Sequence, residues 1–127
     1  MAEADKKRIL VVDDDPEITE MLHIILDLAG YDVRIAHGTA QGMAAVNADP
    51  PDLIVLDVMM PHLSGLELCR YVRRDPRTTR LPIIILSALA STDKVREGME
   101  AGATAYLTKA LGRDKLLQTI EDALNAA

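Results

Sequence analysis

The chain is 127 residues long, with 49% hydrophobic residues and a formal net charge of −6 at pH 7. This length and composition predict a single domain over residues 1–127 with a substantial core. Residues 1–7 are expected to form a flexible N-terminal segment of this domain. The acidic charge argues against a binder of nucleic acid or of an anionic membrane, because both need a basic surface. No apolar stretch is long enough for a signal peptide or a membrane-spanning helix, so we expect a cytoplasmic protein.

Short β-branched runs alternate along the chain with segments of helical periodicity. The predicted strands cover 8–13, 32–37, 53–57, 82–87 and 105–109. The predicted helices lie near 16–28, 39–48, 64–74, 92–101 and 113–125. This alternation implies an α/β fold with a parallel sheet covered on both faces. The run DVRIAH alternates apolar and polar residues, unlike ILVV, LIVL and IIIL, so we expect it nearer an edge of the sheet.

Polar or charged residues stand where four of the apolar runs end. Asp13 and Asp14 follow ILVV, Asp57 follows DLIVL, Ser87 ends PIIILS, and Lys109 follows AYLT. In open α/β sheets, ligands bind beyond the carboxyl ends of the strands, so these side chains are expected to share one pocket. Asp15 is assigned to a different role, since an Asp followed by Pro16 is typical of an N-cap and the first helical position.

A cluster of three carboxylates at this edge requires compensation. Each pair would repel by roughly 1 kcal/mol in water-like surroundings and about 4 kcal/mol at an effective dielectric constant of 20. Such a cluster either raises its own pKa values or binds a cation. Oxygen ligands suit Mg²⁺, which keeps several waters and accepts phosphate oxygens. The three histidines lack the spacing of a zinc site and are expected at the surface: His23, His37 and His62.

Asp57 is the candidate reacting group. A carboxylate acts as a nucleophile toward phosphorus and gives an aspartyl phosphate, while a cation and the ammonium of Lys109 neutralise the transferring oxygens. Ser87 is expected to hydrogen-bond one phosphoryl oxygen. Taken singly, Ser87 is also an ordinary strand-end residue and Lys109 an ordinary surface charge. Their coincidence at the ends of the strands favours the functional interpretation.

The chain resembles the receiver domain of two-component response regulators over essentially its whole length. The matching segments are ILVVDDDPEI, PDLIVLDVMMPHLSGLELCRYVR, LPIIILSA and GATAYLTKAL. The resemblance implies a CheY-like, flavodoxin-like (βα)5 fold, a three-layer sandwich with strand order 2-1-3-4-5. It implies that Mg²⁺ is held by Asp13, Asp14, Asp57 and the backbone carbonyl of Met59. It also implies that Asp57 is phosphorylated, that Lys109 is the ion partner of the phosphoryl group, and that Ser87 and Tyr106 form the switch.

The resemblance further implies a place in a phosphorelay. A sensor histidine kinase or a histidine phosphotransfer protein would phosphorylate Asp57, and a downstream protein target or output domain would receive the signal. The chain is expected to be a monomer or a phosphorylation-linked dimer. It is not expected to be an enzyme beyond its own phosphorylation and slow dephosphorylation. Gly98 in the interior of the helix near 92–101 is expected to weaken this helix. Phosphorylation is expected to shift the helix together with the strand that contains Tyr106, so that the face formed by residues 88–112 changes.

Two features depart from the family pattern. The residue after the site lysine is usually a proline in a cis peptide, but here it is Ala110. A cis bond before any other residue costs about 2.5–4 kcal/mol. Either the bond between Lys109 and Ala110 is trans, with a displaced loop, or the fold holds a strained cis bond, and we favour the trans bond. The position of Lys109 depends on this bond. Met59 and Leu89 stand where the family controls the lifetime of the aspartyl phosphate. Neither orients an attacking water, so a long-lived phosphorylated state is expected.

Other functions fit the sequence less well. A phosphatase of the haloacid-dehalogenase type needs a second acid two residues after its nucleophile, where this chain has Met59. A flavin or nucleotide site on such a fold needs a Gly-rich or hydroxyl-rich loop after the first strand, where the chain reads DDDPEI. The alternative that stays open is a phosphorylation-independent pseudo-receiver acting as an interaction scaffold, which the Ala110 departure favours.

The apolar residues of the helix near 16–28 allow two interpretations. A stripe at helical spacing contains Ile18, Leu22, Ile25 and Ala29, widened by Met21 and Leu28. Ile24 points away from this stripe. Either the helix carries a docking patch for the helices of a kinase or phosphotransfer protein, or it has a broad core-facing stripe with one exposed isoleucine.

Two further features receive structural interpretations. Five arginines lie at the end of the helix near 64–74 and in the loop after it: Arg70, Arg73, Arg74, Arg77 and Arg80. They are expected to be solvated, because cations near a helix C-terminus complement its dipole. The single cysteine, Cys69, falls at helical spacing from Leu66 and Val72 and is expected in the core rather than in a redox site.

Overall fold

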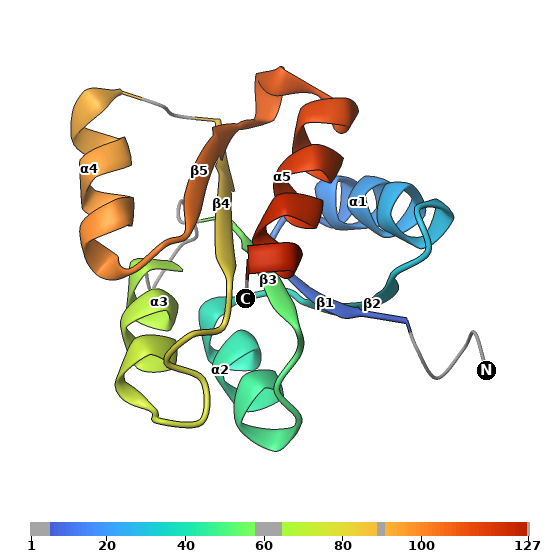
Figure 1. Cartoon of the computed structure of the whole chain (residues 1–127). Helices are drawn as coiled ribbons and strands as arrows, with labels where there is room; N and C mark the ends of the chain where they lie inside the picture. The colour runs from blue at the N-terminus through green and yellow to red at the C-terminus, as the bar shows by residue number, and fades with distance from the viewer. Residues whose placement is uncertain (1–5, 58–64, 89–90, 127) are drawn as a thin grey trace.

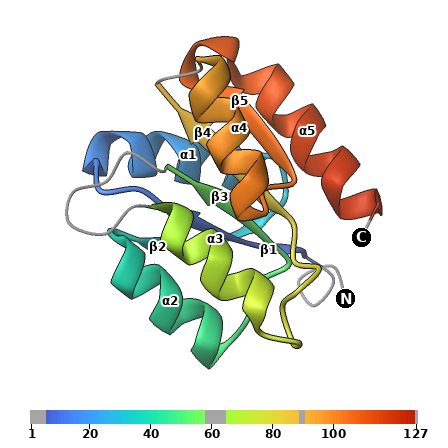
Figure 2. The ribbon, with the colours of Figure 1, turned by 90° about the vertical axis from the view of Figure 1, so that its left-hand side faces the viewer.

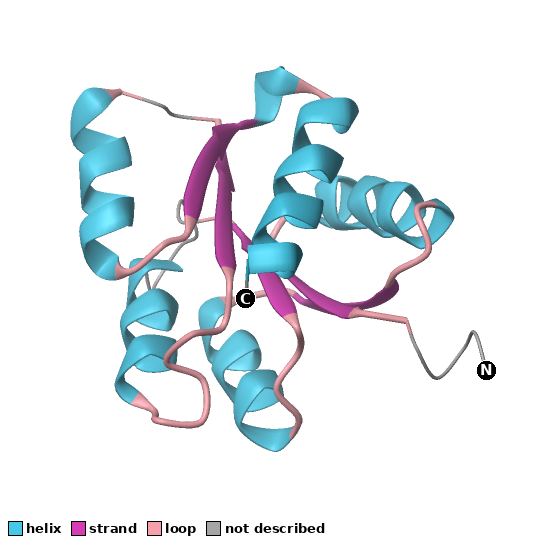
Figure 3. Cartoon of the chain, viewed as in Figure 1, coloured by secondary structure: helices cyan, strands magenta, loops and turns pink. Residues whose placement is uncertain are grey.

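The computed structural model describes residues 6–57, 65–88 and 91–126, in which five strands alternate with five α-helices (Figures 1 and 3). The strands are β1 (Arg8–Val12), β2 (Asp32–Ala36), β3 (Leu53–Leu56), β4 (Ile83–Ser87) and β5 (Ala105–Thr108). The helices are α1 (Pro16–Leu28), α2 (Thr39–Ala48), α3 (Gly65–Arg74), α4 (Thr92–Ala101) and α5 (Arg113–Ala126). The predicted boundaries are confirmed to within one residue. A short 3-10 helix that the sequence does not predict, η1 (Lys109–Leu111), follows β5.

The sheet is parallel throughout, in the order β2-β1-β3-β4-β5, which confirms the flavodoxin-like topology. Every residue of β3 and β4 is buried, as the continuously apolar runs of these strands predict. The alternating segment β2 lies at one edge of the sheet, also as predicted. All strands therefore present their carboxyl ends at one common edge, which brings distant segments of the chain together there.

Helices cover both faces of the sheet. α1 and α5 pack on one face, and α2, α3 and α4 on the other, so the molecule has three layers (Figures 1 and 2). Cys69 lies in the second of these two cores, as predicted, and its burial raises the pKa of the thiol to about 11. A thiol with so high a pKa is almost entirely protonated at neutral pH and a poor nucleophile. None of the described helices has the length and apolar character needed to cross a lipid bilayer.

The start of α1 confirms the role predicted for Asp15. Its side chain accepts a hydrogen bond of 2.9 Å from the backbone N–H of Glu17, and Pro16 occupies the first helical position. This cap satisfies one of the free N–H groups of the first turn and complements the helix dipole. The capping role removes Asp15 from the acidic cluster and leaves Asp13 and Asp14 at the end of β1.

The apolar face of α1 differs from the predicted stripe. Its buried residues are Thr19, Leu22 and Leu26. Met21 and Leu28 were expected to widen the core-facing side, but they are 47% and 82% exposed, and Ile24 is 52% exposed. The interpretation with one exposed isoleucine is therefore wrong, because three large apolar side chains of this helix face solvent. The stripe is displaced because the sheet lies beneath Leu22 and Leu26.

The arginine-rich segment also needs one correction. Arg70, Arg74, Arg77 and Arg80 are exposed, as predicted. Arg73 is not simply solvated, because its guanidinium donates hydrogen bonds to the carbonyl oxygens of Gly102 at 2.9 Å and Leu81 at 2.6 Å. Its partial burial lowers the pKa of the guanidinium. Arg73 thus joins α3 to the segment that follows α4.

Candidate functional site

The pairing of β1 with β3 places two of the predicted site residues side by side. Val12 is in register with Leu56, and Asp13 and Asp57 are the next residues of the two strands. Their backbone N–H groups continue the ladder, since Asp13 donates to Ala36 at 3.1 Å and Asp57 to Val12 at 2.9 Å. Asp13 is 3% exposed and Asp57 8% exposed, so both carboxylates lie in a recess at the carboxyl edge of the sheet.

Asp14 completes an acidic cluster at this edge. One carboxylate oxygen from each of Asp13, Asp14 and Asp57 lies within 4.8 Å of the others, and Asp14 itself is exposed. These donors are all hard oxygens, and the exposed side leaves room for water, so the cluster fits the coordination habits of Mg²⁺. Met59, whose backbone carbonyl was predicted as a further ligand, lies outside the described residues, as do His62 and Leu89. His23 and His37 are exposed, as expected.

Lys109 joins the two buried carboxylates. Its Nζ donates to Asp13 Oδ2 and to Asp57 Oδ2, at 3.2 Å in each case. None of the described peptide bonds is cis, so the predicted trans bond between Lys109 and Ala110 is confirmed. The chain accommodates this bond in η1, which begins at Lys109 itself. The expected displacement of the loop therefore does not carry the ammonium group away from the site.

The electrostatics of the recess follow from burial and from the neighbouring charges. Burial raises the pKa of Asp13, assisted by the charge of Asp57, and outweighs the hydrogen bond from Asp15 and the cation of Lys109. Burial alone would lower the pKa of Lys109, but the charges of Asp57 and Asp13 outweigh it and the net pKa is raised. Lys109 is therefore a firmly charged cation between two carboxylates.

Ser87 and Tyr106 lie on the strands next to this recess. Ser87 is the last residue of β4, is fully buried, and is in register with Thr108, the neighbour of Lys109. Tyr106 is half-buried in β5, in register with Ile85, and packs against the core beneath α2, α3 and α4. The predicted site residues at the ends of β1, β3, β4 and β5 are thus gathered at one edge of the sheet. Tyr106 lies two residues before the end of β5 and therefore further from this edge.

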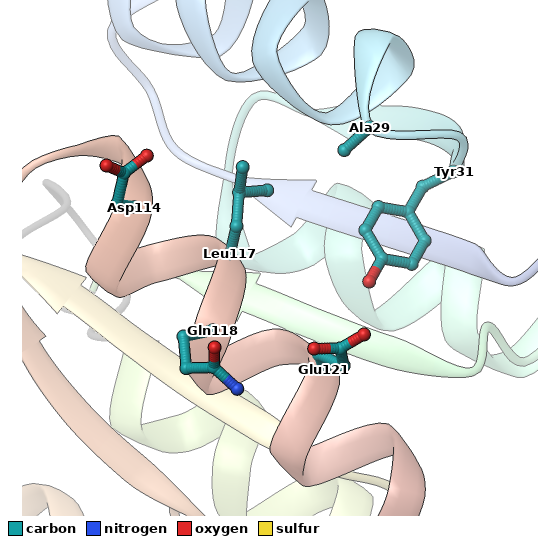
Figure 4. A pocket seen from close by; sticks show the side chains of 6 residues that line it. All are labelled: Ala29, Tyr31, Asp114, Leu117, Gln118 and Glu121. Atoms are coloured by element: carbon teal, nitrogen blue, oxygen red, sulfur yellow. The ribbon is translucent and has the colours of Figure 1, made fainter.

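A groove between α1 and α5 is a feature that the sequence did not predict. One pocket of about 370 Å³ is lined by residues of α5 and of the turn after α1: Ala29, Tyr31, Asp114, Leu117, Gln118 and Glu121 (Figure 4). A neighbouring pocket of about 400 Å³ shares Ala29, Asp114 and Leu117 and extends to Ile24 and Leu28. Burial and the charge of Glu121 raise the pKa of Tyr31. The apolar residues on the α1 side of this groove are visible in the sequence. That α5 lies opposite them is not, because the two helices are brought together only by the fold.

Comparison with known proteins identifies the family. The model of the response regulator receiver domain matches residues 9–121. The chain belongs to this family. A putative response regulator from Chloroflexus aurantiacus has a similar structure, with a TM-score of 0.91 and 35% identity, covering 95% of this chain and 99% of the other. The chemotaxis protein CheY4 of Vibrio cholerae gives a TM-score of 0.88 at 32% identity, covering 93% of this chain and 98% of its own.

Curated relatives of this receiver domain are response regulators. The phosphate regulon transcriptional regulatory protein PhoB of Pseudomonas aeruginosa is 41% identical over 118 residues, which are 93% of this chain and 52% of PhoB. The DNA-binding dual master transcriptional regulator RpaA of Synechocystis sp. is 40% identical over 113 residues, 89% of this chain and 47% of RpaA. The response regulator MprA of Mycobacterium avium is 44% identical over 110 residues, 87% of this chain and 47% of MprA. The receiver domain thus spans about half the length of these relatives.

Proposed function

We propose that this receiver domain accepts a phosphoryl group on Asp57 and signals through the change that follows. The observation that supports the proposal is the position of Asp57 Oδ2, 3.2 Å from Lys109 Nζ and beside the oxygens of Asp13 and Asp14. The ammonium group of Lys109 is thus close enough to the Asp57 carboxylate to offset the negative charge of an incoming phosphoryl group. Apart from this self-modification, we assign the chain no enzymatic activity.

The phosphodonor in this proposal is a phosphohistidine of a sensor kinase or phosphotransfer protein. One oxygen of the Asp57 carboxylate forms a bond to phosphorus, the phosphorus–nitrogen bond breaks, and its electron pair passes to the imidazole. The product is an aspartyl phosphate. Lys109 is placed to hold one of the phosphoryl oxygens, and Ser87, at the end of the neighbouring strand, is assigned to another.

Asp13, Asp14 and Asp57 are the residues that would hold Mg²⁺. When bound, the cation neutralises charge on the transferring oxygens. Both carboxylate oxygens of Asp13 accept hydrogen bonds. Oδ1 accepts one from the backbone N–H of Asp15 at 3.0 Å, and Oδ2 accepts one from Nζ of Lys109. The Asp13 carboxylate is thereby fixed in direction before any ligand arrives.

The groove between α1 and α5 is our proposed docking surface for the donor protein. Met21, Ile24 and Leu28 expose apolar surface on α1, next to the two pockets described above. α1 starts three residues after Asp13, and α5 starts four residues after Lys109, so both helices that border the groove begin beside the phosphoacceptor site. An amphipathic helix is the kind of partner that fits such a groove.

The signal would leave through Ser87, Tyr106 and the face over 88–112, to a protein target or an output domain. One relative is named as DNA-binding and another as a transcriptional regulatory protein, and each is about twice as long as the matched region. We assign DNA binding to no part of this chain, whose net charge is −6. Phosphorylation-linked dimerisation is part of the same proposal.

Phosphoryl uptake is tested by intact-mass measurement after incubation with acetyl phosphate and Mg²⁺. We expect one phosphoryl adduct on the wild-type chain, lost on chelation of Mg²⁺ and absent in Asp57→Asn. The matched control is Asp32→Asn, which removes an exposed carboxylate at the amino end of β2 and should leave the adduct unchanged. A wild-type chain that stays unmodified would instead support the scaffold function.

A further inference from the structure

Gly98 lies at a close contact between α4 and the sheet. It is buried in the interior of the helix, and a Cβ atom built on it would lie 2.9 Å from Cδ2 of Tyr106 and 2.8 Å from Cδ1 of Ile85. Real Cβ atoms are essentially never found below 3.0 Å from such neighbours. The absence of a side chain at this position therefore provides the space in which the Tyr106 ring rests.

The two neighbours differ in how readily they would move. Ile85 meets Gly98 through Cδ1, the end of a flexible side chain, which a rotation about one bond displaces. Tyr106 meets it through Cδ2, at the base of a rigid planar ring, with Cε2 also within 3.2 Å. A side chain at position 98 would thus act mainly on the ring of Tyr106, which has to turn as a whole.

α4 is attached to the rest of the protein near its C-terminal end. Its two buried residues, Gly98 and Ala101, both lie in its second half, and the others are half-buried or exposed. Gly102 ends the helix with a φ of 113°, and its carbonyl accepts the 2.9 Å hydrogen bond from Arg73. A Cβ atom on Gly102 would lie 2.6 Å from Cγ of Arg73, so the arginine packs closely over this end of α4.

We propose that Gly98 is the positioning residue for Tyr106. In the resting protein the Tyr106 ring packs against Gly98 beneath α4. When the ring leaves this position, α4 shifts about its C-terminal end, which Arg73 holds in place. The link between ring and phosphorylation rests on the function proposed above, whereas the packing of the ring on Gly98 does not. Any larger residue at position 98 drives the ring out without phosphorylation.

The test compares Gly98→Ala with Gly42→Ala. Gly42 is a matched control, because it is also buried inside a helix on the same face of the sheet, and its Cβ would lie 3.0 Å from Leu68 and 3.2 Å from Val12. The readout is the set of tyrosine ring signals in NMR spectra of the unphosphorylated chain. The aromatic spectrum is simple, since the chain has three tyrosines and no Phe or Trp.

We expect Gly98→Ala to shift the ring signals of Tyr106 and to leave those of Tyr31, on the opposite face, in place. Gly42→Ala should leave Tyr106 unshifted while it disturbs Leu68. Equal Tyr106 shifts in the two variants, or none in Gly98→Ala, would overturn the proposal. Both substitutions improve the intrinsic helix propensity, so a loss of stability reports the close contact.

A double-mutant cycle keeps the proposal testable if Gly98→Ala unfolds the chain. In a Tyr106→Ala background the ring is gone, and Gly98→Ala should lower the urea midpoint by less than half as much as it does in the wild type. An undiminished loss, or a double variant that still fails to fold, would show that the ring is not what Gly98 accommodates.

Phosphorylation separates this proposal from the function on which it draws. Gly98→Ala should still take up a phosphoryl group from acetyl phosphate, measured by mass, because the neighbours of position 98 are Ile85 and Tyr106. In the wild type, phosphorylation should move the Tyr106 signals toward their positions in unphosphorylated Gly98→Ala. Uptake without such movement would overturn the link to signalling. A chain that takes up no phosphoryl group would refute the proposed function, while the unphosphorylated spectra would still decide the role of Gly98.

Discussion

Lys109 Nζ lies 3.2 Å from Asp57 Oδ2, although Lys109 is followed by alanine through a trans peptide bond. From the sequence, the position of Lys109 depends on this bond, because a trans bond is expected to displace the loop. The structure shows how the contact is kept. η1 turns the chain directly after β5, so that the long lysine side chain returns over the carboxylates.

Ala110→Pro should disturb this arrangement. A proline disfavours the helical region for the residue before it, and η1 places Lys109 in a helical turn. We expect slower phosphorylation by acetyl phosphate, measured by intact mass over time. Ala110→Ser is the control, since Ala110 is exposed and serine keeps the backbone free to form η1. An unchanged rate in the proline variant would show that η1 does not position Lys109.

Lys109→Met should leave the carboxylates of Asp13 and Asp57 without their cation. Both are nearly buried, so we expect a loss of about 1–3 kcal/mol in the free energy of unfolding, measured with urea in the presence of a chelator. Excess Mg²⁺ should reduce this loss, because a cation that binds only the folded state stabilises it and takes over the neutralising role. A deficit that Mg²⁺ leaves untouched would argue against a cation site formed by these carboxylates.

The parts of the site that the sequence predicts are those that depend on local signals or on strand direction. The cap at Asp15 follows from two adjacent residues, and the meeting of Asp13 with Asp57 follows from the rule that parallel strands share one carboxyl edge. The strand order β2-β1-β3-β4-β5 came from the family resemblance, because alternation of strands and helices does not determine order.

The features that the sequence does not predict depend on packing between distant segments. Arg73 looks like one of five solvated arginines, but its acceptors lie at Leu81 and Gly102, which only the fold brings to it. In the sequence, Gly98 indicates only a weakened α4. In the structure, the ring of Tyr106 occupies the space that a side chain at position 98 would need. Periodicity identified the apolar residues of α1 without indicating which of them the sheet covers.

The thiol of Cys69 should make stability depend on alkaline pH. In the unfolded chain the thiol has its ordinary pKa of 9.0, and burial raises it to about 11 in the folded protein. As pH rises through this window the unfolded state loses its proton first, so the free energy of unfolding falls, by up to about 1.4 kcal/mol per pH unit. Cys69→Ala should show a shallower decline between these pH values in urea titrations, whatever its stability at neutral pH. Parallel curves for the two proteins would contradict the assignment.

The exposed apolar residues of α1 provide a test of the docking surface. Ile24→Ser and Leu28→Ser remove side chains that are 52% and 82% exposed, so the free energy of unfolding should change by no more than about 0.5 kcal/mol. If a phosphohistidine protein docks here, each variant should take up phosphoryl groups from it about 10-fold more slowly, as expected for the loss of an apolar anchor.

Acetyl phosphate needs no docking surface, so its rate of reaction with the same variants should stay at the wild-type value. Met99→Ser is the matched control, because Met99 is 44% exposed but belongs to α4, on the opposite face of the sheet. Equal slowing by Met99→Ser would point to a general effect of losing surface apolar groups. Unchanged transfer to both α1 variants would remove the groove between α1 and α5 from the donor interface and leave its exposed side chains to another partner.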